Sequence, residues 1–235
     1  MTWLWRICFS ASVAISLNPA TVSGTVELRD SNVPKVRKKM DFSGVVVWLE
    51  PVSGPARVEV AAHHAKMVQK DKTFTPHVLA VPVGATVDFP NFDPIFHNAF
   101  STYNGQIFDV GLYPPGSSRS VRFARPGIVR VFCNIHATMS AIIAVLNAPW
   151  FAVTDTKGEF NIRDVPAGGY RLQFFHERAT AATLDSLRRK IEIGDTPFTL
   201  GTIDISESGY LPIPHKNKYG RDYPPAGDSS YPVDR

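Results

Sequence analysis

The sequence of 235 residues is poor in cysteine, in net charge and in segments that could form helices. Its 2 cysteines cannot supply a disulfide framework, and a formal charge of +4 is weak for a protein that binds polyanions. We therefore expect no nucleic-acid partner. The motifs of serine hydrolases, zinc proteases and phosphate-binding loops are missing, and we expect no enzyme. With 44% hydrophobic and 20% charged residues, the composition is that of a soluble globular protein and excludes disorder throughout.

The first 20 residues follow the pattern of a secretory signal. A basic residue precedes the uncharged, mostly apolar stretch 7–17, which is too short to cross a bilayer as a stable helix. We expect residues 1–20 to be a signal peptide cleaved near Ala20. The protein would then be periplasmic or secreted, with no membrane span after signal removal.

The two cysteines lie far apart, and only one of them follows the expected cleavage site. Cys8 lies in the leader, so Cys133 would be the single cysteine of the mature chain. A lone thiol in an oxidising compartment needs an explanation. It is buried and inert, it pairs with another chain, or it binds a metal.

Short strands separated by turn residues fill most of the chain. Alternating or apolar runs predict strands at 22–28, 44–49, 78–83, 86–89, 120–123, 129–132, 141–146, 151–154, 158–162, 170–175, 191–193 and 200–205. We expect 120–123 to pair with 129–132, and the basic stretch 35–39 to be a solvated hairpin tip. Only 180–189 predicts a helix. The fold class is all-β, built from β-sandwiches, and the aperiodic residues 207–235 predict an extended or disordered tail.

Potential metal ligands are concentrated in two stretches. The first ends in His97, and the second has the spacing Cys133-x2-His136-x2-Met139. A thiolate, two imidazoles and a thioether form a soft, mixed donor set, and His2Cys with a weak axial Met is the ligand set of blue copper. Zinc could use the cysteine and the histidines, but a structural zinc site would need a stronger fourth ligand than a thioether.

The period of the strands supports this set. Side chains alternate along a strand, so one face of 129–133 holds Cys133, and a matching row follows Met139 on the next strand. The two inward rows are Val129, Val131 and Cys133, and Met139, Ala141, Ile143 and Val145. Each ligand alone would more often be an ordinary core or turn residue. Their conjunction favours a metal site.

Residues 66–149 resemble a cupredoxin, the plastocyanin and amicyanin family of type 1 copper proteins. The matching motifs are GATVDFPNFD, HN at 97–98, VRVFC and CNIHATM. The short ligand loop is most similar to the amicyanin type, although the proline usual beside its second histidine is missing. The resemblance implies a Greek-key cupredoxin β-sandwich over 61–149 that binds one type 1 copper. It also implies the equatorial ligands His97, Cys133 and His136, the axial ligand Met139 and a bracing role for Asn98.

The remaining motifs resemble a carboxypeptidase regulatory-like, or transthyretin-like, β-sandwich. They are SGTVEL, GVVVWLEP, TDTKGEFNIRDVPAGGYRLQFFHE and KIEIGD. This resemblance implies a discontinuous domain of residues 21–60 and 150–206 into which the cupredoxin is inserted. The plainer alternative is that residues 21–60 supply the first strands of the cupredoxin itself.

The ligand set predicts an exported blue copper protein that carries single electrons between redox partners. A redox protein would dock near His136, on an apolar patch formed by Pro94, Ile95, Phe96, Leu112, Tyr113 and Pro114. Two alternatives are a copper-binding or delivery protein without electron-transfer turnover, and a structural exported sandwich with an empty site. The sequence leaves the oligomeric state open.

Overall fold

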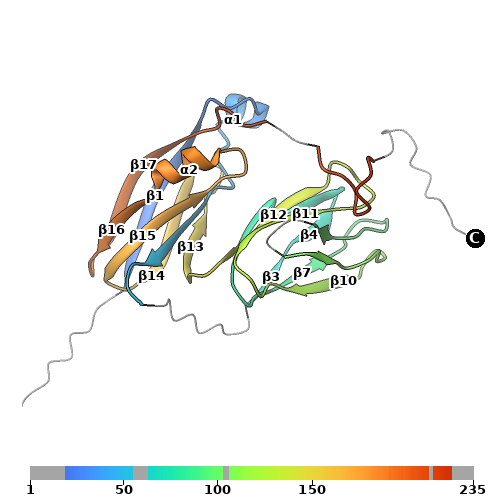
Figure 1. Ribbon diagram of the computed structural model, residues 1–235, viewed down its shortest axis with the longest axis horizontal. Coiled ribbons are helices and arrows are strands. Elements are labelled where there is room, and N and C mark those ends of the chain that lie inside the picture. Colours follow the sequence, from blue (N-terminus) through green and yellow to red (C-terminus); the bar gives the residue numbers. More distant parts are fainter. Residues whose placement is uncertain (1–18, 55–62, 103–105, 212–213, 224–235) are drawn as a thin grey trace, which may run out of the picture.

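The computed structural model describes residues 19–54, 63–102, 106–211 and 214–223. Within these ranges the chain is nearly all β and forms two sandwiches that lie next to each other (Figure 1). The predicted all-β sandwich class is therefore confirmed. The expected signal peptide lies outside the described residues up to position 18, and Ala20 is the buried first residue of β1 (Ala20–Arg29).

The first sandwich is built from two distant parts of the chain. In one sheet, β1 lies between β14 (Glu159–Val165), to which it is antiparallel, and β17 (Phe198–Ser206), to which it is parallel. The other sheet has the order β13-β2-β15-β16, with β13 (Trp150–Val153), β2 (Val46–Pro51), β15 (Gly168–Phe175) and β16 (Arg189–Ile193). The early strands thus pair with strands of the segment 150–206.

The second sandwich comes from the segment between those two parts. One sheet has the order β10-β7-β3, with β10 (Ser118–Arg122), β7 (Thr86–Pro90) and β3 (His64–Lys66). The other has the order β6-β12-β11-β8-β9, with β6 (Val78–Pro82), β12 (Ser140–Leu146), β11 (Gly127–Phe132), β8 (Phe100–Ser101) and β9 (Phe108–Asp109). A hairpin of β4 (Val68–Lys70) and β5 (Thr73–Thr75) completes it.

One predicted strand pairing is wrong. The strand at 118–122 pairs with β7, whereas β11 pairs with β12 and β8. The turn at residues 125–127 therefore carries the chain from one sheet of the sandwich to the other instead of closing a hairpin. Turn residues mark where the chain reverses, and they do not say which strands become neighbours.

The basic stretch 35–39 is also not a hairpin tip. It forms the short helix α1 (Pro34–Lys39), with proline in the first turn and basic residues in the last, as the helix dipole favours. Val36 is buried and fixes the helix to the first sandwich. The predicted helix at 180–189 is present as α2 (Ala181–Leu187), which Thr180 caps by accepting a hydrogen bond from the Thr183 amide at 3.2 Å.

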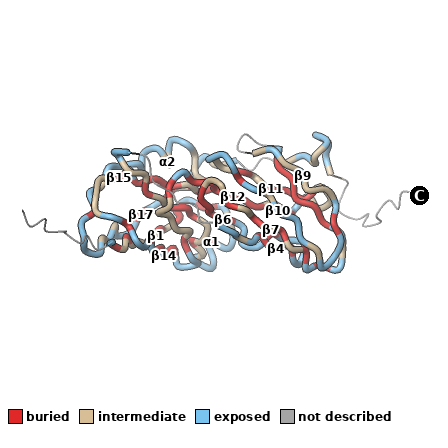
Figure 2. The backbone as a smooth tube through the Cα atoms, turned by 90° about the horizontal axis from the view of Figure 1, so that it is seen from below, coloured by how far each residue is buried: buried red, intermediate tan, exposed pale blue. Residues whose placement is uncertain are grey.

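The two sandwiches are joined by a third apolar cluster. Along β2, Val47 lies in the core of the first sandwich and Val46 in the cluster between the sandwiches; along β12, Ile143 lies in the core of the second and Ile142 between them. The runs Gly44–Leu49 and 141–146 are apolar throughout because both faces of each strand are covered. Figure 2 shows the buried backbone of β6 and β12 in the middle of the molecule.

Candidate metal centre

Three predicted ligands converge at one end of the second sandwich. Cys133 directly follows β11, His136 lies in the loop before β12, and His97 lies between β7 and β8. The Nδ1 atoms of His97 and His136 lie 3.8 and 3.6 Å from Sγ of Cys133, and one donor atom from each residue lies within 4.8 Å of the others. The centroids of the His97 and His136 rings are 4.9 Å apart.

These separations fit a single metal ion. Bonds from a first-row metal to imidazole nitrogen and thiolate sulfur are about 2.0–2.3 Å long, so two ligands at trigonal or tetrahedral angles lie about 3.6–3.8 Å apart. Both thiol-to-imidazole distances fall in this interval. The donor set of one thiol and two imidazoles is soft and suits copper or zinc.

A carboxylate orients the first histidine. Oδ2 of Asp93 lies 2.7 Å from Nε2 of His97, and both side chains are buried. Because a carboxylate accepts, Nε2 carries the proton, which leaves the lone pair of Nδ1 directed toward the thiol. Burial would raise the pKa of Asp93, but the Lys72 amide, the His97 ring and the Asp71 amide all donate to it and hold that pKa below its usual value.

His97 is also fixed through its backbone. Its amide donates to the Tyr113 carbonyl at 3.3 Å, and the Tyr113 amide donates back at 2.9 Å. The ring of Tyr113 is fully buried, with its hydroxyl 2.7 Å from Oε1 of Gln69. Tyr113 therefore does not belong to the exposed docking patch that the sequence suggested. It supports the ligand-bearing segment from within the core.

The thiol of Cys133 is buried and free of any disulfide. Burial raises its pKa, while the amides of Asn98, Ile135 and His136, which point at the sulfur, act in the opposite direction. Burial lowers the pKa of His136, and the positive charge of Lys72 acts in the same direction. The site therefore favours a neutral imidazole, and the buried sulfur has amide donors ready for a thiolate. Metals bind a neutral imidazole and a thiolate, so the thiol of Cys133, whose pKa burial raises, must lose its proton as the metal binds.

Met139 lies at the other end of the ligand loop. Its amide donates to the His136 carbonyl at 3.0 Å, and its carbonyl accepts from the Cys133 amide at 3.1 Å. Its side chain is fully buried in the same apolar cluster as Cys133. All members of the two predicted inward rows lie in that cluster, as their period requires. The loop thus brings the thioether residue back beside the thiol residue.

Asn98 connects the two ligand-bearing segments. Its Oδ1 accepts from the Asn134 amide at 2.6 Å, one residue after Cys133, and its Nδ2 donates to Asp109 at 3.1 Å. The side chain therefore braces the start of the ligand loop. The sequence identified Asn98 through the resemblance but missed Asp93. The only signal for Asp93 was a carboxylate four residues before a histidine.

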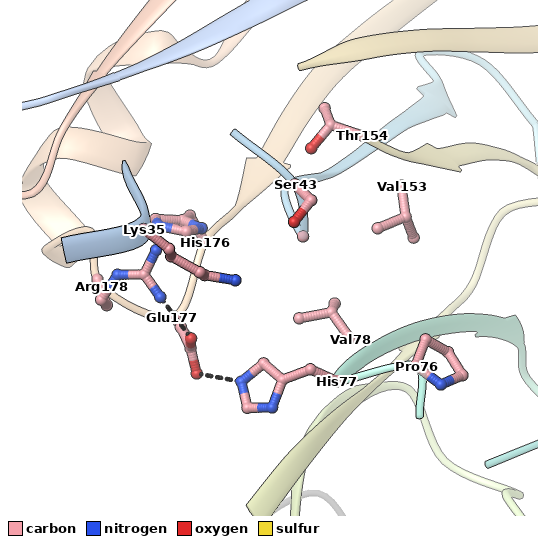
Figure 3. Close-up of a pocket in the computed structure, with 11 residues that line it drawn as sticks. Lys35, Ser43, Pro76, His77, Val78, Val153, Thr154, His176, Glu177 and Arg178 are labelled. Carbon is pink, nitrogen blue, oxygen red and sulfur yellow. Dashed lines mark hydrogen bonds and ion pairs between the residues drawn. The ribbon is translucent and has the colours of Figure 1, made fainter. Parts of the chain in front are cut away.

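A separate cavity of about 150 Å³ lies where the two sandwiches meet. Its lining includes an ion network in which Glu177 accepts from His77 at 3.0 Å and from Arg178 at 2.7 Å (Figure 3). None of the four predicted ligands lines it. The cavity is thus distinct from the donor cluster, and its charged side chains already have partners, because Lys35 pairs with Asp41 at 3.6 Å and Glu177 with His77 and Arg178.

Among the described residues, no helix has the length and apolar character needed to span a membrane. No family model matches the chain. No curated protein matches it either.

Solved structures similar to this chain include three copper proteins. A purple cupredoxin from Nitrosopumilus maritimus is 23% identical, with 35% of this chain and 99% of that chain covered and a TM-score of 0.32. A copper-containing nitrite reductase from Thermus scotoductus is 27% identical, with 41% and 25% covered and a TM-score of 0.35. A reduced Cu(I) amicyanin variant is 20% identical, with 43% and 98% covered and a TM-score of 0.34. Similarities at these TM-scores do not assign a function. The function proposed below is inferred from the donor atoms of this chain.

Proposed function

We propose that this chain is an exported type 1 copper protein that carries single electrons between redox partners. The observation that carries the proposal is the spacing of the donors: two imidazole nitrogens lie 3.8 and 3.6 Å from a buried thiol sulfur. A His2Cys set with a nearby methionine is the blue copper ligand set. We assign His97, Cys133 and His136 as equatorial ligands and Met139 as the axial ligand.

Copper, when bound, supplies reversible one-electron exchange. The residues of this chain hold the ligands in place, because Asp93 fixes the ring of His97 and amides point at the sulfur of Cys133. The apolar cluster that contains Cys133 and Met139 excludes water from the thiol and the thioether. Ligands that are fixed before and after electron transfer need little rearrangement, which is the requirement for a fast carrier.

The electron would leave through the most exposed of the ligands. His136 is half-buried, whereas His97 and Cys133 are fully buried. Apolar side chains are exposed on the segments that flank His97: Phe92 by 63%, Phe96 by 46% and Leu112 by 57%. Weak redox encounters use small interfaces, and this group is the docking patch that we propose for a redox protein.

The proposal is tested with a pair of variants. Cys133→Ser should abolish the intense blue absorption of the Cu(II) protein, because the thiolate is the source of that charge-transfer band. His64→Gln, at an exposed histidine of β3, should leave it unchanged. Visible absorption and EPR after addition of one equivalent of Cu(II) provide the measurement. An unaltered blue colour in Cys133→Ser would refute the assignment.

The kinetics separate a carrier from a delivery protein. A carrier should exchange electrons rapidly between its own Cu(I) and Cu(II) forms and release copper slowly to a chelator. Rapid copper release combined with slow self-exchange would instead support delivery.

A further inference from the structure

The chain returns to the metal centre after it has completed the first sandwich. Beyond β17, residues 214–223 lie against the end of the second sandwich, beside the loop between β11 and β12 (Figure 1, red). We name residues 214–223 the strap. They belong to the segment that we expected to be an extended or disordered tail, and they are instead folded through hydrogen bonds of their own.

Asn217 closes the strap on itself. Its amide donates to the Arg221 carbonyl at 2.9 Å, and its side-chain oxygen accepts from the amides of Tyr219 and Arg221, each at 3.0 Å. Gly220 has a φ of +73°, which favours glycine, and its amide donates to the Asn217 carbonyl. This turn places the rings of His215 and Tyr223 5.1 Å apart, so both ends of the strap face the same surface.

Both ends of the strap bind the ligand loop 133–139. The hydroxyl of Tyr223 donates to the carbonyl of Cys133 at 2.7 Å. Nε2 of His215 lies 2.8 Å from the Ala137 carbonyl, so it is the protonated nitrogen, and its ring stacks on Phe132 with centroids 4.0 Å apart. The strap therefore satisfies two loop carbonyls, one of which belongs to a ligand residue.

The middle of the strap reaches both ligand-bearing segments. The Lys218 amide donates to the side chain of Asn134 at 3.0 Å, and its ammonium forms an ion pair with Asp109 at 2.8 Å. Asp109 in turn accepts from Asn98, which accepts from the Asn134 amide. These four residues form a closed circuit of hydrogen bonds. The residue after His97 and the residue after Cys133 are thus tied to each other and to the strap.

We propose that the strap holds the ligand loop in its metal-ready conformation, with Tyr223 and Lys218 as positioning residues for the metal centre. Its role toward copper rests on the function proposed above. The loop has no proline of its own to stiffen it, and each carbonyl that is held by a hydrogen bond removes backbone freedom from the ligands. A segment that follows the first sandwich thereby completes the site of the second.

The first test uses the copper-free protein, so it does not depend on the proposed function. Tyr223→Phe removes only the hydroxyl that holds the Cys133 carbonyl. One lost hydrogen bond costs about 0.5–1.5 kcal/mol, so amide hydrogen exchange across 133–139 should become about two- to tenfold faster. Tyr170→Phe removes a hydroxyl hydrogen bond to the Pro166 carbonyl at 2.9 Å in the first sandwich, so it is the matched control and should leave exchange across 133–139 at the wild-type rate. Exchange in β1 reports whether the fold is intact.

The second test uses the Cu(II) protein. The charge-transfer band and the reduction potential should shift in Tyr223→Phe but not in Tyr170→Phe, because only in Tyr223→Phe does the thiolate ligand lose the group that fixes its backbone. Exchange across 133–139 that is the same in Tyr223→Phe and the wild type would overturn the strap proposal. Failure of the wild type to bind copper would overturn the proposed function, and the exchange experiment would still decide whether the strap holds the loop.

Discussion

At the scale of single residues, the sequence identified the donors but not the groups that orient them. Cys133 and His136 share one short loop, and the period of β11 places the thiol inward, so spacing was sufficient to find them. Asp93 and Tyr113 both hold His97, which lies outside the regular strands. The periodicity of apolar residues does not predict the path of the chain in such a segment. Their roles depend on which backbone groups meet after folding. Tyr113 was therefore wrongly expected at the surface.

Met139 offers the clearest test of a single ligand. Met139→Leu conserves volume and removes the thioether, so the protein should keep its copper and its blue colour while its reduction potential shifts upward. The free energy of unfolding should fall by less than about 1.5 kcal/mol. Cyclic voltammetry of the Cu protein measures the potential.

The control for Met139→Leu is Met67→Leu. Met67 is equally buried in the same apolar cluster, so this variant repeats the change in packing without touching the ligand loop. The potential should stay at the wild-type value. Equal potentials in Met139→Leu and the wild type, or equal shifts in both variants, would show that Met139 is not an axial ligand.

At the scale of elements, the positions of the strands were easier to predict than the strands with which they pair. The alternation of Val22, Val26 and Leu28 follows burial in β1, because only one face of that strand packs on the core. The apolar runs in β2 and β12 arise because other strands pack on both faces of each. In the sequence this burial is visible only as a lack of polar residues in the run. The partner of β10 was missed because pairing is decided by sandwich topology rather than by the nearest turn.

Gly158 tests how closely the turn before β14 approaches the backbone of β1. Its φ is +79°, and a Cβ there would lie 2.0 Å from the carbonyl oxygen of Val26 in β1. Gly158→Ala should lower the free energy of unfolding by more than about 2 kcal/mol, because backbone cannot move aside as a side chain can. Gly54→Ala shares the positive φ but meets nothing within 4 Å, so it should cost clearly less. Denaturant unfolding that gives equal costs would contradict this close approach.

At the scale of the whole molecule, three connections unite the sandwiches. They are the apolar cluster between β2 and β12, the ion network around Glu177, and the strap. The sequence could not show any of them, because each joins segments far apart in the chain. Its motifs favoured the insertion hypothesis, and in the structure β1 and β2 pair with strands after residue 150. Assignment of the first sandwich to the carboxypeptidase regulatory-like family stays a prediction.

The ion network predicts an acid-dependent stability. Burial would raise the pKa of Glu177, but His77 and Arg178 outweigh it and lower that pKa from 4.5 to about 2. A depressed pKa stabilises the fold above the unfolded value, and this stabilisation is lost as pH falls from about 4.5 toward about 2. Glu177→Gln should therefore lower the free energy of unfolding by about 1–2 kcal/mol at neutral pH and flatten its fall across that window.

Glu159→Gln is the matched control for this prediction, because Glu159 is exposed on β14. Its unfolding free energy should follow the wild type at every pH. Denaturant titrations at pH values between 2 and 7 provide the comparison. An unchanged slope in Glu177→Gln would show that the network does not couple protonation to stability.

The central claim is that His97, Cys133 and His136 form a type 1 copper site. Titration of the copper-free protein with Cu(II), followed by visible absorption and EPR, tests it most directly. A type 1 site should give an intense blue thiolate charge-transfer band with narrow copper hyperfine splitting, saturating at one copper per chain. Weak absorption with ordinary tetragonal copper signals, or no binding, would contradict it.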